Sequence, residues 1–548
     1  MMRLNALKNI KTFDTDLSAE RDAYTLGLVL IVGLMVLTPI LSLITPISSL
    51  VWVAIICLVY GIAAIAIGRI TIGVYVSLLV SLMFAADIPL ASSEYLLSMT
   101  RDIGPSIWFA HIPLFGFLGM LYFQDKKQFL HITKEEIFLG AFIIWTIFAA
   151  AITDPVRLDA PIYFALFILW GGLIFAAVRR AHRILPISGR TTMSIIFTAV
   201  LANALFALTE ILHGDSYGLT TLGELSPEYT DQIAGIIVGP ITLPVGTFVS
   251  GFSGMSFILA SIIILVAPFS LSLLFEHSPY IKLAGVLSTL ILVVVLRFTA
   301  SDAARGGLLL AIGIIFAYII VMWLRDNRTI DHRTLVIILT MAILCTGIVL
   351  FPSTMSGTPG EQSIQQGPET PEEQHTQKDT TESNSPVDES EVSVPLFDLS
   401  NLGPRLQQYT IGVSLFTEQP IFGIGGGNFA EISQEYNLHE QKPIHNVYIS
   451  LLAETGIIGF ILYTGFLVTV LRRGVQGMTA AADTIPLQLV ILAGVIGYLG
   501  FMFWDHLLFN SIVGSFTFYA VCATLVSRKQ DNNNLRLSRE SRTGSQSP

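Results

Sequence analysis

The sequence predicts an all-α membrane protein whose helices cross the bilayer many times. Of its 548 residues, 53% are hydrophobic and only 13% are charged, whereas soluble globular proteins carry about 25% charged residues. Fourteen apolar stretches of about 17 to 25 residues can be marked off, each long enough to cross a hydrocarbon core of about 30 Å as a helix. This composition excludes a soluble globular enzyme and directs attention to loops and intramembrane charges.

The predicted spans alternate with short loops. Their approximate bounds are 24–44, 48–67, 70–90, 107–123, 137–153, 161–178, 192–212, 252–275, 280–298, 306–324, 334–352, 446–471, 486–504 and 507–526. A cytoplasmic N-terminus places 23 Lys and Arg inside against seven outside, and cytoplasmic loops retain such residues. We therefore expect a multi-pass protein of the plasma (inner) membrane with both termini in the cytoplasm. A count of 12 stays open, because 48–67 and 70–90 could be re-entrant.

The predicted organisation follows from these spans. It comprises a cytoplasmic tail 1–23, a transmembrane bundle 24–352, an external loop in two parts, C-terminal helices 447–526 and a cytoplasmic tail 527–548. The first part of the loop, 353–394, is acidic and almost without large apolar residues, which predicts disorder. Apolar residues return in the second part, 395–446, which is expected to fold into short helices and turns on the membrane surface.

The distribution of charge excludes a nucleic-acid partner. Residues 353–446 contain 3 Lys or Arg and 14 Asp or Glu, a charge of −11, so the rest of the chain carries +1. Basic residues are spread over many short loops, and no cationic face is formed. Cys57, Cys345 and Cys522 fall in predicted spans at spacings unlike those of metal ligands, so neither a metal nor a cofactor is expected.

Ionisable side chains within the spans gather toward one side. In the predicted topology they lie in the outer half or at the outer boundary: Asp87, His111, Glu210, Arg297, Asp302, Arg305, Glu454, Asp505 and His506. A charge at the bilayer centre is costly, so such residues mark functional sites by default, although any single one could extend to the headgroups. The set predicts a polar cavity that opens outward beneath the loop.

The stretch 420–466 carries the most informative motif, PIFGIGGGNFAEISQEYNLHEQKPIHNVYISLLAETGIIGFILYTGF. It resembles the C-terminal signature of the O-antigen ligase and polymerase superfamily, in which a Gly-x-Gly-x-Gly-Asn-Phe element precedes a His-Asn pair that opens a helix. The helix of that family continues with residues matched here by Leu452, Ala453, Glu454, Gly456 and Gly459. The segment SDAARGGLLLAIG at 301–313 is similar to the family's Ser-Arg-Gly motif, and Arg405 occupies the place of the arginine that opens its folded loop.

The resemblance implies transfer of a glycan from a polyprenyl diphosphate carrier on the outer side of the membrane. His445 would act as the general base, since imidazole has a pKa of about 6.5. Arg305 would bind the diphosphate, because guanidinium groups can grip phosphate oxygens bidentately. Inversion at the anomeric carbon is expected. The family's arginine before the Gly-Thr-Phe element is missing from 241–244; either Arg297 takes its place or fewer contacts are used.

Other residues of the predicted site have more than one possible role. Arg405 and Arg297 could bind substrate or support the loop. Asn446 suits an N-cap as well as a substrate contact. Glu454 follows His445 by nine residues, which on a helix turns it to the opposite side, so helix packing or pairing with an arginine is the alternative to substrate binding.

Several functions are compatible with the pattern. The expected donor is a lipid-linked glycan, and the acceptor is a glycan, a lipid or a protein, so ligase, polymerase and protein oligosaccharyltransferase all stay open within cell-surface polysaccharide biosynthesis. A flippase of lipid-linked oligosaccharides is the alternative from another class, and a scaffold for surface assembly is a third. A flippase needs a polar path through both leaflets, whereas the ionisable residues here lie on one side.

Overall fold

The computed structural model describes residues 21–27, 69–85, 87–89, 106–153, 155, 159–213, 216–217, 219, 223–224, 233–238, 241–246, 249–276, 278–299, 301–326, 346, 402–436, 443–478 and 487–527. The predicted spans 24–44, 48–67 and 334–352 and the acidic segment 353–394 lie wholly or largely outside them. The choice between 12 and 14 helices therefore stays a prediction.

Long apolar helices dominate the described part of the chain. Those long enough to cross a membrane are α6 (Lys134–Thr153), α7 (Asp159–Ile184), α8 (Gly189–His213), α9 (Ser256–Ser272, extended by η4, Leu273–Phe275), α10 (Pro279–Phe298), α11 (Asp302–Asp326) and α15 (Val447–Met478). Shorter apolar helices are α3 (Ile70–Ser81), α4 (His111–Gln124), α16 (Leu487–Phe501) and α18 (Ile512–Val526). These seven candidate spans confirm a multi-pass membrane protein.

Two short hairpins interrupt the helical pattern. Strands β1 (Asp87–Pro89) and β2 (Ser106–Trp108) pair antiparallel. The prediction of helices over 70–90 and 107–123 is therefore wrong at the C-terminal end of the first and at the N-terminal end of the second. The apolar run continues past Ser81, but a residue before proline favours extended backbone, which suits Ile88 to a strand. Strands β3 (Ile233–Val238) and β4 (Ile241–Gly246) form the second hairpin, in a loop for which the sequence indicated no strand.

The core of the bundle surrounds α9, which packs against α8, α10, α11, α16 and α18. Glycines allow the central helices to approach closely, as small residues do in membrane bundles. A Cβ at Gly307 of α11 would lie 2.7 Å from the carbonyl oxygen of Gly497 on α16, and one at Gly494 would meet the carbonyl of Leu265 on α9. Side chains at these positions would force the helices apart.

Helix α15 is broken at Gly456, whose φ of 66° and ψ of −175° are not helical. The break exposes backbone groups that an intact helix would use internally, and the glycine-rich segment 420–425 pairs with them. Ile424 and Gly425 donate N–H groups to the carbonyls of Ala453 and Glu454, both at 3.0 Å, and Ile457 donates to the carbonyl of Pro420 at 2.9 Å. The segment 420–425 is thus fixed to α15 through main-chain hydrogen bonds.

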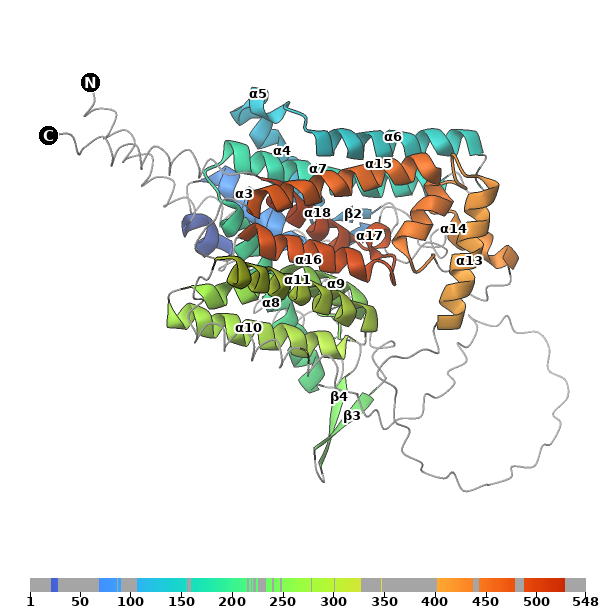
Figure 1. The fold of residues 1–548 in the computed structure, drawn as a ribbon. Coiled ribbons are helices and arrows are strands. Elements are labelled where there is room, and N and C mark those ends of the chain that lie inside the picture. The colour runs from blue at the N-terminus through green and yellow to red at the C-terminus, as the bar shows by residue number, and fades with distance from the viewer. Residues whose placement is uncertain are drawn as a thin grey trace, which may run out of the picture.

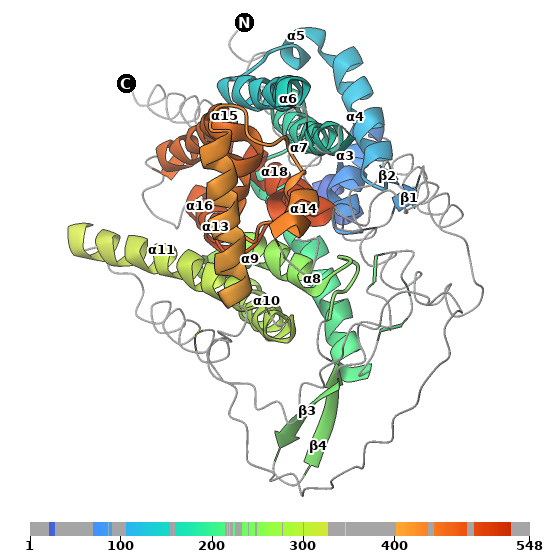
Figure 2. The ribbon, with the colours of Figure 1, turned by 90° about the vertical axis from the view of Figure 1, so that its right-hand side faces the viewer.

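The described residues of the predicted loop segment 395–446 form a cap at one end of the bundle. Helix α13 (Leu402–Glu418) runs across the ends of the long helices, next to α14 (Phe429–Ile432) (Figures 1 and 2). Helix α13 packs on α15. Its residues Ile411 and Leu415 form a small apolar core with Ile424, Phe429 and Ile444. We call this end of the bundle the His445 end, after the residue that precedes α15.

Substitution of Gly456 by alanine should destabilise the protein. The new Cβ would overlap the carbonyl of Ile421, and a non-glycine residue in this backbone region costs about 1–3 kcal/mol from strain alone. We expect a lower thermal unfolding midpoint in detergent. Gly313→Ala is the matched control, because a Cβ there meets no heavy atom within 4 Å; equal stability of the two variants would contradict this account of the break.

Candidate functional site

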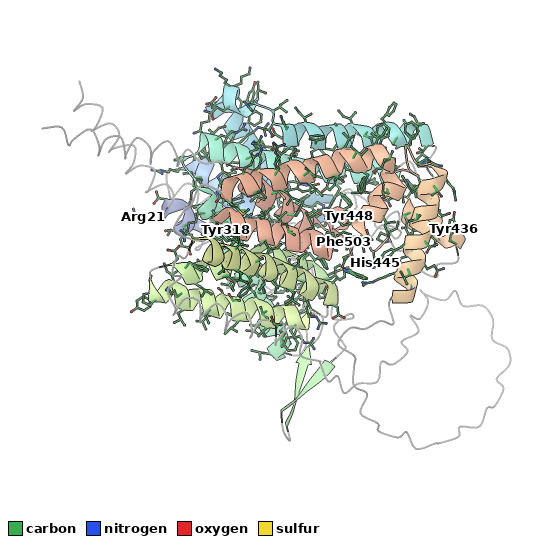
Figure 3. All side chains as sticks on the ribbon, in the orientation of Figure 1. Arg21, Tyr318, Tyr436, His445, Tyr448 and Phe503 are labelled. Carbon is green, nitrogen blue, oxygen red and sulfur yellow. The ribbon has the colours of Figure 1, made fainter. Side chains whose placement is uncertain are left out.

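His445 lies two residues before the start of α15, half-buried, at the point where the chain enters the bundle. The next residue, Asn446, caps the helix: its Oδ1 accepts hydrogen bonds from the N–H groups of Tyr448 and Ile449, both at 3.0 Å. This is the N-cap role that the sequence indicated as one alternative. The Nδ2 of Asn446 donates to the carbonyl of Phe503 at 3.0 Å. Figure 3 shows His445 beside Phe503 and Tyr448.

Helix α13 holds His445 through two neighbouring side chains. The Oε1 of Gln408 lies 2.9 Å from the imidazole Nδ1 and 3.2 Å from the backbone nitrogen of His445. The hydroxyl of Tyr409 donates to the carbonyl of His445 at 2.8 Å, and it lies 3.3 Å from the carbonyl of Phe503. Both the ring and the main chain of His445 are therefore fixed by α13.

A second imidazole faces the first. The rings of His445 and His506 meet edge to face, with centroids 4.8 Å apart and an interplanar angle of 81°. His506 lies in the turn between α16 and α17 (Leu507–Asn510). Oδ1 of Asp505 accepts the backbone N–H of His506 at 2.7 Å and lies 3.4 Å from its Nδ1. The turn therefore places an imidazole and a carboxyl beside His445.

Asp505 is buried in this turn, and burial raises the pKa of its carboxyl from 3.8 to about 6. The N–H of His506 and the positive charge of Arg405 act on the pKa in the opposite direction, but burial outweighs them. Because the charge of Arg405 lowers the pKa of Asp505, Arg405 on α13 lies near the turn that faces the His445 ring. Arg405 precedes Gln408 and Tyr409 by three and four residues and shares their face of the helix.

Arg305 and Arg297 flank the turn between α10 and α11. Arg305 is half-buried in the first turn of α11 and forms an ion pair with Asp302, three residues earlier. Arg297 lies in the last turn of α10, close enough for its charge to act on that of Arg305. Two guanidinium groups held near each other at the end of a helix pair can bind an anion with several oxygens.

Helix α16 contacts both α11, which carries Arg305, and α15, which follows His445. Gly307, two residues after Arg305, packs against Gly497 and Phe501 near the end of α16. The chain immediately beyond this end accepts hydrogen bonds from the start of α15: Val447 donates to the carbonyl of Met502 at 3.1 Å. Gly307 of α11 and Val447 at the start of α15 thus contact the same segment, 497–503.

Glu454 is directed toward the glycine-rich loop. Its buried carboxylate accepts backbone N–H groups of Gly427 and Phe429 and the hydroxyl of Ser450. In the structure it therefore holds the loop against α15, which fits the packing alternative. The contact of Glu454 with substrate stays a prediction.

The sequence did not single out Gln408 and Tyr409, although both contact His445. The signal that could have found them is helical spacing, because residues three and four positions after Arg405 share its face once 402–418 is helical. Asp505 and His506 were noted as ionisable but were not placed beside His445. Their position depends on the turn between α16 and α17, which spacing alone does not define.

The opposite end of the bundle also buries ionisable side chains within its helices, so the expectation that such residues lie on one side only is wrong. Glu135 of α6 is fully buried and forms two ion pairs: its Oε2 lies 3.0 Å from Nη1 of Arg179, and its Oε1 lies 2.5 Å from Nε of Arg473. Arg180 forms a separate ion pair with Glu136. A cavity of about 380 Å³ between α6 and α15 is lined by Lys134, Glu135, Thr469, Arg472, Arg473 and Gln476. The charges of this end mainly hold α6, α7 and α15 together.

Stability should depend on the ionisation of Asp505. Because the pKa in the folded protein, about 6, exceeds the ordinary 3.8, the protonated carboxyl favours folding and the ionised one opposes it. The free energy of unfolding should therefore lose this contribution as the pH rises from about 4 to about 6. In the Asp505→Asn variant, the unfolding temperature should depend less on pH between about 4 and 6, and above pH 7 it should exceed that of the wild type. Thermal unfolding in detergent at a series of pH values measures both effects. Glu418→Gln, at an exposed position of α13, is the control; identical pH curves for the wild type and Asp505→Asn would contradict the prediction.

Comparison with known proteins relates part of this site to a described family. A search of curated protein sequences gives no match. Residues 287–464 match the family model described as O-antigen ligase. The matched range includes Arg297, Arg305, Arg405, His445 and Glu454 and all of α13. The chain is therefore a multi-pass membrane protein that contains, over residues 287–464, the domain of the O-antigen ligase family, a family of glycosyltransferase-like enzymes.

Proposed function

We propose that this protein transfers or polymerises a glycan from a polyprenyl diphosphate donor onto an acceptor on the extracytoplasmic side of the membrane. His445 is the general base, and Arg305 is the clamp for the diphosphate. The observation that carries the proposal is the fixed imidazole of His445 at the entrance to a membrane helix, within a domain of the O-antigen ligase family. The acceptor is a glycan, a lipid or a protein.

The charges of the bundle support an outward orientation of the His445 end. Lys and Arg are retained on the cytoplasmic side of membrane proteins. The opposite end carries Lys134, Arg472 and Arg473 around its cavity, and Arg179 and Arg180 in ion pairs. With that end in the cytoplasm, His445 and the cap formed by α13 face outward, where the glycan-loaded carrier is used.

The proposed reaction is a displacement at the anomeric carbon. The acceptor hydroxyl, or an amide nitrogen in a protein acceptor, attacks that carbon and gives its proton to His445. The bond from the anomeric carbon to the diphosphate oxygen breaks, and its electron pair leaves with the lipid diphosphate. Arg305 offsets the negative charge that grows on the leaving group, assisted by Arg297 and Arg405. One displacement inverts the anomeric configuration.

Replacement of His445 by alanine should stop transfer while the donor still binds. General bases contribute about 10²- to 10⁴-fold to rate, so surface glycan should fall by that order. In whole cells, glycan-loaded carrier should accumulate on the outer face, where a membrane-impermeant glycosidase releases its sugar. His131→Ala, an exposed histidine at the opposite end, is the matched control.

The same experiment separates transfer from flipping. A flippase that loses an essential residue leaves its loaded carrier on the cytoplasmic face, protected from the external glycosidase. Protected carrier would therefore support transport, and unchanged surface glycan would reject His445 as the base.

Replacement of Arg305 by lysine should lower the rate although the charge is retained. Lysine cannot make the planar bidentate contact with phosphate oxygens, and a hydrogen bond to a charged group is worth about 1.5–3 kcal/mol, so the rate should fall about 10- to 100-fold. The transfer rate in vesicles measures this effect. Arg190→Lys, whose arginine pairs with Glu276 away from the site, is the control. A wild-type rate for Arg305→Lys would reject the bidentate clamp.

A further inference from the structure

The oxygen of Gln408 receives two hydrogen bonds from one residue. It accepts the backbone N–H of His445 at 3.2 Å and lies 2.9 Å from Nδ1 of the same residue. A backbone N–H can only donate, so the amide of Gln408 must present its oxygen and not its NH₂ group. An amide oxygen can only accept, so Nδ1 must carry a proton. Neutral His445 is then left with its lone pair on Nε2.

We propose that Gln408 is a positioning residue that keeps His445 in the tautomer whose Nε2 can take the acceptor proton. This inference rests on the proposed role of His445 as the base. Without an acceptor at Nδ1, the ring proton could move to Nε2, which would then have no lone pair to offer. Gln408 does not touch substrate and acts only through the imidazole.

The surroundings of Gln408 suit this role. Its side chain is only 6% exposed, so water does not compete well for its oxygen. Tyr409, the next residue of α13, holds the carbonyl of His445 at 2.8 Å. Rotation of the Gln408 amide would break both hydrogen bonds to His445 at once. The main chain and the ring of His445 are therefore held by consecutive residues of one rigid helix.

The neutral amide also affects how readily the ring gains a proton. A carboxylate in this place would stabilise the imidazolium strongly, as acidic partners of catalytic histidines do. The titratable groups of the described residues around the ring are His506, Asp505, Arg405 and Tyr409. With an uncharged acceptor at Nδ1, His445 stays neutral, and ready to accept a proton, at lower pH than it would beside a carboxylate.

The test compares Gln408→Leu with Gln408→Glu. Initial rates of glycan transfer are measured over about pH 5 to 9 in right-side-out vesicles from cells in which each variant replaces the wild-type chain, so that native donor and acceptor are present. The leucine variant should lose about 10- to 100-fold in rate with the half-saturating donor concentration nearly unchanged. The glutamate variant keeps an acceptor oxygen and should recover most of the rate at high pH. The ascending limb of the pH–rate profile of this glutamate variant should shift to higher pH by about one unit or more.

Matched controls come from the neighbouring residue. Gln407 lies on the exposed side of α13, and Gln407→Leu and Gln407→Glu should leave both the rate and the pH profile unchanged. Asp505→Asn, measured in parallel, separates the titration of that carboxyl from the titration of His445.

Two outcomes would overturn the inference. One is a wild-type rate and pH profile for Gln408→Leu. The other is an equal loss in the leucine and glutamate variants with an unmoved pH profile, because a purely structural role would give that result. Failure of the underlying function is distinguishable, since His445→Ala would then still transfer glycan. A dead His445→Ala variant with an unaffected Gln408→Leu variant rejects only the role of Gln408.

Discussion

The break in α15 at Gly456 is the constraint on which the arrangement of the site depends. An intact helix would keep the carbonyls of Ala453 and Glu454 for itself. Because the helix opens there, the segment 420–425 binds those carbonyls, and the cap formed by α13 and α14 is held against the bundle. Gln408 and Tyr409 reach His445 only from this cap. A backbone irregularity about ten residues into a helix thus fixes side chains at the start of the same helix.

Much of the fold followed from hydropathy, since long apolar runs have few alternatives to membrane helices. The predicted spans 137–153, 161–178, 192–212 and 280–298 each lie within an observed helix. Hydropathy failed where the apolar run outlasted the helix, as at Pro89, because a strand in a hairpin is as apolar as a helix end. The break at Gly456 was also missed: the glycine was recognised as part of a motif, but its backbone conformation depends on the loop that packs on it.

The sequence predicted several residues of the candidate site but not the contacts between them. His445, Arg305 and Arg405 were chosen from motifs, and the matched family covers all three. The residues that orient His445 could not be found in the same way. Gln408 is a neutral side chain in a polar loop, and His506 is about sixty positions away along the chain. Only the packing of α13 and of the turn between α16 and α17 on the start of α15 brings them together.

The position of Arg405 and Gln408 on one face of α13 has a mechanical consequence. Residues three apart on a helix keep a separation of about 5–6 Å between their Cβ atoms, whatever the helix as a whole does. The guanidinium of Arg405 and the amide of Gln408 therefore change position together when α13 moves. Any change in the position of α13 relative to α15 would therefore act on both groups at once, and neither could be repositioned without the other.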